Sequence, residues 1–242
     1  MMARRPRWRS LALVLALLAL ALAGSSAAGP ASAQGRGPSD DARASASLDV
    51  ASSAIPTAAQ PLVTDSARAD TVLGPGSGKA VATAVSTSNC AGCSGTAITF
   101  QTVSVATGGP AMADNVATAW SSCASCSSSA VSVQIVTGSS ASAVTVNNRS
   151  LALNVACASC TTTAVALQFV VIGATQRALS ASTRALIKKI EQQLGIKLSV
   201  GPQNRASAQK DADDAAAQAK SEIAKDTGAA DVRTKVGVDS GD

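Results

Sequence analysis

Apolar and polar residues alternate strictly along three stretches of this chain, giving each stretch one face of larger apolar residues and one of small or polar residues. In the third stretch, Val165, Leu167 and Phe169 alternate with Ala166 and Gln168. A period of two residues with β-branched and aromatic side chains is typical of a strand whose two faces differ. The chain is therefore predicted to be built around strands.

The three stretches belong to a repeat that begins with a Cys-x-x-Cys motif. Its first cysteines occupy positions 90, 123 and 157, which are 33 and then 34 residues apart. A less regular alternation precedes each motif, so each unit is expected to be a hairpin whose turn the cysteines bracket. Residues 80–174 are thus predicted to form a mainly β domain of three tandem β-hairpin repeats, with about six antiparallel strands. The cysteines of the three turns are Cys90, Cys93, Cys123, Cys126, Cys157 and Cys160.

A glutamine stands at the same place in each unit, at Gln101, Gln134 and Gln168. Stacked repeats would bring the three side chains to equivalent positions, where an amide can donate to and accept from its neighbours. We therefore expect an interaction ladder of these glutamines. The alternative is that all three lie on a solvated face.

Helical periodicity replaces the strand pattern near residue 175. Leu186, Ile187, Ile190 and Leu194 fall at helical spacing, and Gly195 is expected to end the helix. Residues 175–200 are predicted to be an amphipathic helix that packs on or beside the sheet. Its basic second face leaves contact with a membrane surface as the less favoured alternative.

The final part of the chain, residues 201–242, is rich in alanine and charge, with almost no apolar stripe. This composition predicts a solvated helix or a loose tail, with about a dozen disordered residues at its end.

The N-terminus has the composition of an export signal. Four arginines among the first nine residues precede an apolar run over positions 11–23, whose 13 residues are fewer than the roughly 20 needed to span a bilayer. Cleavage is expected after Ala33 or, alternatively, after Ala23, so residues 1–33 are predicted to be a signal peptide and the protein to be secreted. The other possibility is an uncleaved membrane anchor.

A spacer is predicted between the signal and the repeats. Residues 34–79 are rich in Ala, Ser, Pro and Gly and contain no aromatic residue. Such a segment buries too little apolar surface to offset the entropy lost on ordering. It is expected to be a disordered linker.

Charge argues against a nucleic-acid partner once the signal is set aside. The full chain has 20 basic and 15 acidic residues, a net charge of +5, but the chain after Ala33 has 16 and 15. Between positions 80 and 175 the charged residues are Asp114 and Arg149. The basic surface that binds a phosphate backbone is therefore not expected.

The six cysteines are open to three kinds of chemistry. Local disulfides within each Cys-x-x-Cys fit an exported chain with an even cysteine count, although six cysteines allow 15 pairings. Two facing Cys-x-x-Cys turns would instead make a four-cysteine zinc site. Thiol–disulfide exchange is the third option, but its low-pKa cysteine normally sits at a helix N-terminus, and strands follow the cysteines here.

No catalytic constellation is found in the sequence. The chain has no His, the commonest general base near neutral pH, and it has no Tyr. Asp114 is the one carboxylate between positions 80 and 175, so paired carboxylates are not expected there. We therefore expect no catalytic residues, no bound cofactor and no enzymatic activity.

The repeats resemble a group of exported bacterial proteins with tandem Cys-x-x-Cys units, each followed by an alternating Ala-rich strand that ends in Gln. The best matching segments are Leu151-Ala-Leu-Asn154 and Cys160-Thr-Thr-Thr-Ala-Val-Ala-Leu-Gln168. The resemblance covers positions from about 80 to 174 and implies export and a repeat fold, with no assigned activity.

The sequence favours an exported, non-enzymatic structural, adhesive or interaction protein built from disulfide-stapled hairpins. A sheet with few charges at its edges is prone to pair with other strands, so self-association or a protein partner at the sheet edges is expected. The alternative is an extracytoplasmic thiol–disulfide or zinc-binding protein that uses the Cys-x-x-Cys pairs.

Overall fold

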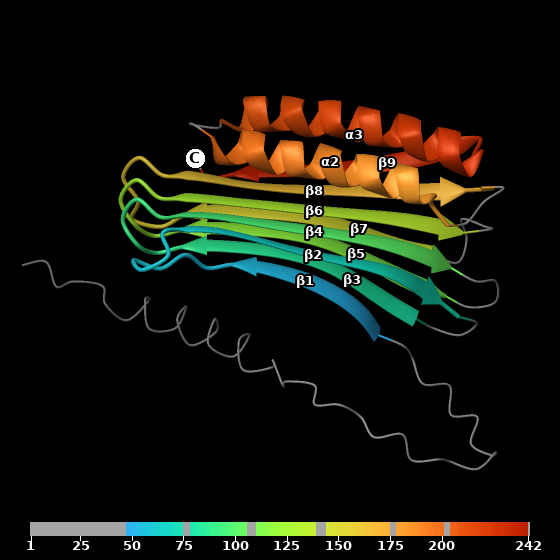
Figure 1. The fold of residues 1–242 in the computed structure, drawn as a ribbon, viewed down its shortest axis with the longest axis horizontal. Helices are drawn as coiled ribbons and strands as arrows, with labels where there is room; N and C mark the ends of the chain where they lie inside the picture. Colours follow the sequence, from blue (N-terminus) through green and yellow to red (C-terminus); the bar gives the residue numbers. More distant parts are fainter. Residues whose placement is uncertain are drawn as a thin grey trace, which may run out of the picture. The chain divides into compact units, whose positions relative to one another are not determined.

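Eight successive strands, two helices and a ninth strand make up the part of the chain that the structure describes (Figure 1). A computed structural model describes residues 47–74, 78–105, 110–138, 144–174, 178–200 and 204–241. The elements are β1 (Ser47–Ala54), β2 (Leu62–Leu73), β3 (Gly78–Ser88), β4 (Ser94–Val105), β5 (Ala111–Ser121), β6 (Ser127–Gly138), β7 (Val144–Asn154), β8 (Thr161–Ile172), α2 (Ala181–Ser199), α3 (Arg205–Thr227) and β9 (Asp231–Ser240).

The strands form a β-solenoid of two facing sheets. The odd-numbered strands form one sheet in the order β1-β3-β5-β7, and the even-numbered strands form the other in the order β2-β4-β6-β8-β9. All neighbours are parallel except β8 and β9, which are antiparallel. Figure 1 shows the arrows of β1 and β2 pointing in opposite directions, as expected for strands joined by a reversing turn.

The mainly β class with a C-terminal helix is confirmed, but the strand pairing differs from the expected antiparallel hairpins. The two strands of a unit reverse direction at the Cys-x-x-Cys turn and then lie in different sheets. Each strand pairs instead with its equivalent in the next unit, so that Ala97, Ala130 and Ala164 are direct neighbours. This register places identical side chains next to one another, so that the glutamines described below can form hydrogen bonds with each other.

The space between the two sheets is filled mainly by small side chains. Its central cluster consists of buried alanines from both sheets, and larger residues such as Leu73 and Val103 occupy the end away from the cysteines. Because alanine projects only one carbon, the facing sheets pack around a narrow interior. The alanines are Ala54, Ala84, Ala97, Ala117, Ala119, Ala130, Ala152, Ala164 and Ala166.

The larger apolar residues of the even-numbered strands point outwards and are covered by the helices. Ile187, Ile190, Leu194 and Leu198 of α2 pack on this face, and Val133 is one of the strand residues beneath them. The apolar face of α2 is therefore buried against the sheet. This is the arrangement that the sequence favours over contact with a membrane surface. No helix in the described ranges has a stretch long and apolar enough to cross a membrane.

Gly195 does not end α2, contrary to expectation, because the helix continues to Ser199. A Cβ atom at Gly195 would lie 2.9 Å from Cδ1 of Ile98 on the sheet. The glycine therefore permits close approach of the helix to β4. The helix begins after Ser180, whose hydroxyl accepts a hydrogen bond from the amide of Thr183.

The flanking segments contain more regular structure than the sequence predicts. The expected linker at residues 34–79 includes β1 and β2, which form a further strand pair on the first repeat, whereas residues 1–46 lie outside the described ranges. The alternating residues of β1 and β2 differ little in hydrophobicity, but small side chains are enough to fill the narrow interior between the sheets. The expected signal peptide, with its alternative cleavage sites at Ala23 and Ala33, also lies outside the described residues.

The alanine-rich segment after residue 201 is likewise ordered, as α3 and β9. One face of α3 is buried through Ala208, Ala212, Ala216 and Ala219, which are spaced at about one helical turn. Because alanine is small and only weakly hydrophobic, these residues give the sequence no strong apolar stripe. Their small side chains nevertheless let α3 pack closely against its neighbours. Strand β9 then pairs with β8 and closes that edge of the even-numbered sheet.

Candidate functional site

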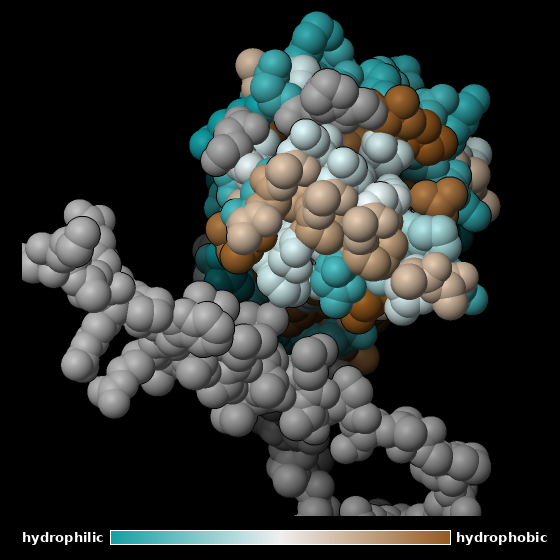
Figure 2. All heavy atoms as spheres, turned by 90° about the vertical axis from the view of Figure 1, so that its left-hand side faces the viewer, coloured by the Kyte–Doolittle hydropathy of each residue, from teal (hydrophilic) through white to brown (hydrophobic). Residues whose placement is uncertain are grey.

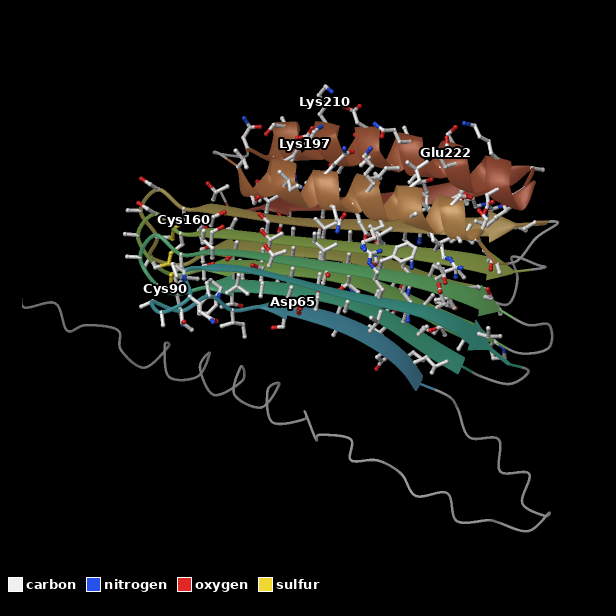
Figure 3. All side chains as sticks on the ribbon, viewed as in Figure 1. Asp65, Cys90, Cys160, Lys197, Lys210 and Glu222 are labelled. Carbon is white, nitrogen blue, oxygen red and sulfur yellow. A yellow bond between two sulfur atoms is a disulfide. The ribbon has the colours of Figure 1, made fainter. Side chains whose placement is uncertain are left out.

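The three Cys-x-x-Cys motifs form reversing turns that stack at one end of the solenoid. The sulfur atoms within each pair lie at disulfide distance, and the Cα separations are 5.4, 5.7 and 5.8 Å for the first, second and third pairs. These separations fall in the usual disulfide range. Figure 3 shows Cys90 and Cys160 at the same end of the strands. Of the three kinds of cysteine chemistry, the structure corresponds to local pairs.

A left-handed residue shapes each turn. The third position of each motif has positive φ: 70° at Gly92, 54° at Ser125 and 58° at Ser159. In the first turn, the amide of Cys93 donates to the carbonyl of Cys90 over 2.9 Å. Glycine suits the left-handed conformation, whereas serine adopts it at an energetic cost.

Backbone hydrogen bonds hold neighbouring turns together. The amide of Gly92 donates to the carbonyl of Ala124 over 3.1 Å, and the amide of Ser125 donates to that of Ala158 over 2.9 Å. Figure 2 looks onto this end and shows largely neutral and weakly hydrophobic residues in the middle of the view, with hydrophilic residues above. The stack is a regular surface of small side chains.

The second and third turns bring three sulfur atoms close together. The Sγ atoms of Cys126, Cys157 and Cys160 all lie within 4.8 Å of one another. Cys126 is buried and the other two are half-buried. The sulfurs of Cys157 and Cys160 lie against the backbone carbonyl oxygen of Cys123. Sequence spacing could not show this convergence, because it depends on which turns are stacked.

The three repeated glutamines form a hydrogen-bonded column in the interior. The Nε2 atom of Gln134 donates to Oε1 of Gln101, and Nε2 of Gln168 donates to Oε1 of Gln134, each over 2.7 Å. All three side chains are fully buried. They also donate to carbonyls of the facing sheet, for example from Gln101 to Leu48 over 3.0 Å. The column therefore joins the two sheets as well as successive strands.

A second polar column, which sequence reasoning missed, lies beside the glutamines. The Nδ2 atom of Asn115 donates to Oδ1 of Asn148 over 2.8 Å and also to the carbonyl of Ser132 over 3.0 Å. Asn148 lies within β7. Asn115 and Asn148 are 33 residues apart, so the repeat period was the signal that could have identified them.

The outer face of the odd-numbered sheet, called here the open face, carries no helix among the described residues (Figure 1). Apolar residues gather toward its cysteine end: Leu151 is 45% and Leu153 47% exposed, and Trp120 is half-buried beside them. The outward residues of this face include Asp49, Lys79, Val81, Thr83, Val85, Thr87, Met112, Asp114, Val116, Thr118, Trp120, Asn147, Arg149, Leu151 and Leu153.

An ionic cluster on the helix-covered side fastens α2 to β2. The buried carboxylate of Glu191 pairs with Arg68, whose guanidinium lies 5.5 Å from the ring centroid of Phe100. Burial lowers the pKa of Arg68. Arg184 pairs with Asp70 over 2.8 Å beside a shallow pocket of about 230 Å³. These oppositely charged groups pair with one another, so we interpret the cluster as a contact that holds α2 on β2.

In the comparisons with known proteins, no family model matches the chain, and neither a curated protein nor a solved structure matches it.

Proposed function

We propose that this chain is an exported, non-enzymatic structural or adhesive protein that pairs with a second copy of itself through the open face. Export is supported by the basic and apolar N-terminus, and the non-enzymatic assignment by the absence of His from the sequence. The observation that carries the proposal is the contrast between the two sheets. One has its outer face covered by helices, while the other presents exposed Leu151 and Leu153.

The composition of the open face suits a protein contact. Aromatic residues such as tryptophan often dominate binding energy when they are surrounded by apolar contacts that exclude water. Trp120 neighbours Leu153 in the register of β5 and β7, with Leu151 one outward position away. The face also contains threonines, whose short side chains lose little entropy when covered.

The charges of the open face are self-complementary. Asp49, Lys79, Asp114 and Arg149 lie on β1, β3, β5 and β7, so their signs alternate across the sheet. Lys79 and Asp114 also pair within the chain over 3.7 Å. A two-fold axis parallel to the strands would set β1 against β7 of the partner and β3 against β5. Each acidic strand would then face a basic one, an arrangement that favours this pairing.

The area of the open face is at the lower end for such a dimer. Four strands at about 4.8 Å spacing and about ten residues at 3.3 Å give a footprint of roughly 600 Å². A standard stable interface covers about 800 Å² of accessible surface on each partner. The side chains are held on paired strands, which reduces the entropy lost on association. A closed two-fold dimer that dissociates on dilution is therefore expected.

The sheet edges, where pairing was expected from sequence, carry features that protect them. At one end, Lys235 of β9 donates to the carbonyl of Val146 and Asp239 accepts from the amide of Ala152, both on β7. At the other end, Asp65 accepts from the amide of Ser53 on β1. Charged side chains that occupy edge groups oppose strand addition. The open face is therefore favoured over the edges.

Sedimentation velocity of the mature chain over a range of concentrations tests the proposal. A reversible dimer is expected, and Leu153→Asp should weaken its association at least tenfold. Ile196→Asp is the matched control, because Ile196 is a similarly apolar and somewhat more exposed residue on α2. A monomer at all concentrations, or equal weakening by both substitutions, would show that the open face is not a self-association surface.

Charge reversal tests the pairing itself. Arg149→Asp should weaken the dimer, and combining it with Asp49→Arg should restore association, because the two residues lie on facing strands across the proposed axis, one outward position apart in register. If the double variant is as weak as the single variant, the two-fold arrangement is wrong. Circular dichroism of each variant establishes that it is folded.

A further inference from the structure

Three sulfur atoms converge where the second and third Cys-x-x-Cys turns stack on each other. Cys126 comes from one turn, while Cys157 and Cys160 come from the next, and their Sγ atoms lie within 4.8 Å of one another. Sulfur atoms around one thiolate-bound metal ion are separated by about 4 Å, since metal–sulfur bonds are about 2.3 Å long. Cys157 and Cys160 lie at disulfide distance from each other, so the three sulfur atoms can take this spacing once that bond is reduced.

The stacking of these turns does not depend on the sulfur atoms. The amide of Ser125 donates to the carbonyl of Ala158 over 2.9 Å, and the amide of Thr161 donates to that of Cys126 over 3.0 Å. On either side of the turns, β5 pairs with β7 and β6 pairs with β8 in continuous register. Reducing the cysteines would leave these bonds in place, so the turns would keep the thiols close together.

The surroundings favour a soft ion. Residues 122–129 and 155–163 contain no carboxylate and no imidazole, so the ligands that these turns offer are thiolates, hydroxyls and backbone carbonyls. Thiolates select soft ions such as Cu(I), whereas Mg²⁺ and Ca²⁺ require oxygen ligands. A structural Zn²⁺ site takes four ligands, and the close cluster consists of three sulfurs.

We propose that Cys126, Cys157 and Cys160 bind one cuprous ion when the second and third Cys-x-x-Cys pairs are reduced. Each disulfide takes two electrons and two protons from a dithiol, giving two protein thiols and the cyclic disulfide of the reductant. Binding of Cu(I) then displaces the protons of three thiols, and the Cys123 thiol remains free. The oxidation state of the two cysteine pairs therefore controls metal binding, because the oxidised chain presents no thiolate at this cluster.

The site is tested by anaerobic titration of the fully reduced chain with Cu(I) in competition with a chromophoric Cu(I) chelator. One tightly bound equivalent is expected, with thiolate-to-copper absorption in the near ultraviolet. Alkylation followed by peptide mapping should then show Cys126, Cys157 and Cys160 protected and Cys90, Cys93 and Cys123 modified. This protection map uses the native sequence and does not depend on a variant that folds.

Paired substitutions provide the control. Replacing both Cys157 and Cys160 by Ser should lower the Cu(I) affinity at least 100-fold, whereas replacing Cys90 and Cys93 by Ser should leave it unchanged. Three equivalents bound with equal protection of every pair, or no binding in competition with the chelator, would overturn the proposal. Equal loss of affinity in the two double variants would overturn it as well. Neither result depends on whether the chain dimerises.

Discussion

The side-chain amide of Gln134 donates a hydrogen bond to the side-chain carbonyl of Gln101 over 2.7 Å, and both side chains are fully buried. The two residues lie 33 positions apart and are direct neighbours in the pairing of β4 with β6. A side-chain amide has both donors and acceptors, so identical glutamines satisfy one another when equivalent strands are parallel and in register. This contact thus links the repeat period to the architecture of the solenoid.

The central glutamine should contribute more to stability than the last one. Gln134→Leu leaves Oε1 of Gln101 and an amide proton of Gln168 without their partners, and each unsatisfied buried group costs about 1–3 kcal/mol. Gln168→Leu should cost less, because Oε1 of Gln168 has no hydrogen-bond partner among the described residues. Urea unfolding of both variants measures the difference. Equal losses would contradict a role for the column in stability.

The left-handed turn residues should respond in opposite directions to substitution. Gly92→Ala should lower the free energy of unfolding by about 1–2 kcal/mol, the cost of a left-handed L-residue. Ser125→Gly should raise it by up to about 1 kcal/mol, since glycine removes strain but adds unfolded-state entropy.

These effects isolate conformation, because a Cβ at Gly92 would meet no atom within 4 Å. Gly74 is the control, since it has the same free space without a positive φ. Thermal melts of the three variants give the comparison. A loss for Gly74→Ala as large as that for Gly92→Ala would argue against the turn conformation as the cause.

Reduction should weaken the protein without unfolding it. A loop of about four residues gives a chain-entropy contribution of only roughly 2 kcal/mol per disulfide. The turns also keep backbone bonds such as that from Ser125 to Ala158. Circular dichroism before and after treatment with a phosphine reductant should show unchanged strand content and a lower melting temperature. Loss of the strand signal on reduction would show that the sulfur bonds hold the solenoid together.

Acid should destabilise the junction of the two helices through Asp226. Burial raises the pKa of this carboxyl, but hydrogen bonds from the side chain and amide of Ser180 and from Thr183 outweigh burial, so the net shift is downward. A carboxyl with a depressed folded-state pKa stabilises the protein above its unfolded pKa of about 3.9. That contribution is lost as pH falls through the lower folded-state value.

Asp226→Asn should therefore reduce the dependence of the melting temperature on pH between about 2 and 5. Asp213→Asn on the same helix is the control, because Asp213 is exposed and accepts from the side chain of Gln209. Melting curves at closely spaced pH values decide the question. If the melting temperatures of the native chain and of Asp226→Asn fall equally at low pH, Asp226 is not the cause of the acid destabilisation.

Local patterns identify much of this fold. The alternation of Val165 and Leu167 with Ala166 is sufficient to place a strand and its two faces, because side chains of a strand alternate by geometry. The apolar spacing of Ile187, Ile190 and Leu194 similarly places α2 and its buried face. These features follow from residues that are close together in the chain.

Other elements escape such patterns because their side chains are small. The buried face of α3 consists largely of alanines such as Ala212 and Ala216, and β1 and β2 carry few large apolar residues. Their burial comes from close approach to a neighbour, as with Gly195 over Ile98. A composition that looks solvated along the chain is therefore compatible with a buried position.

The repeat period, the strand faces and the positions of the Cys-x-x-Cys turns follow from the sequence, because each depends on spacing along the backbone. The choice of partner strand does not, since an alternating segment can pair in parallel or antiparallel fashion with the same two faces. Parallel stacking is what makes Gln101 and Gln134 neighbours, brings Cys126 to Cys157 and Cys160, and leaves one sheet face open. These relationships join residues about 33 positions apart, so they arise when the packed core selects one register.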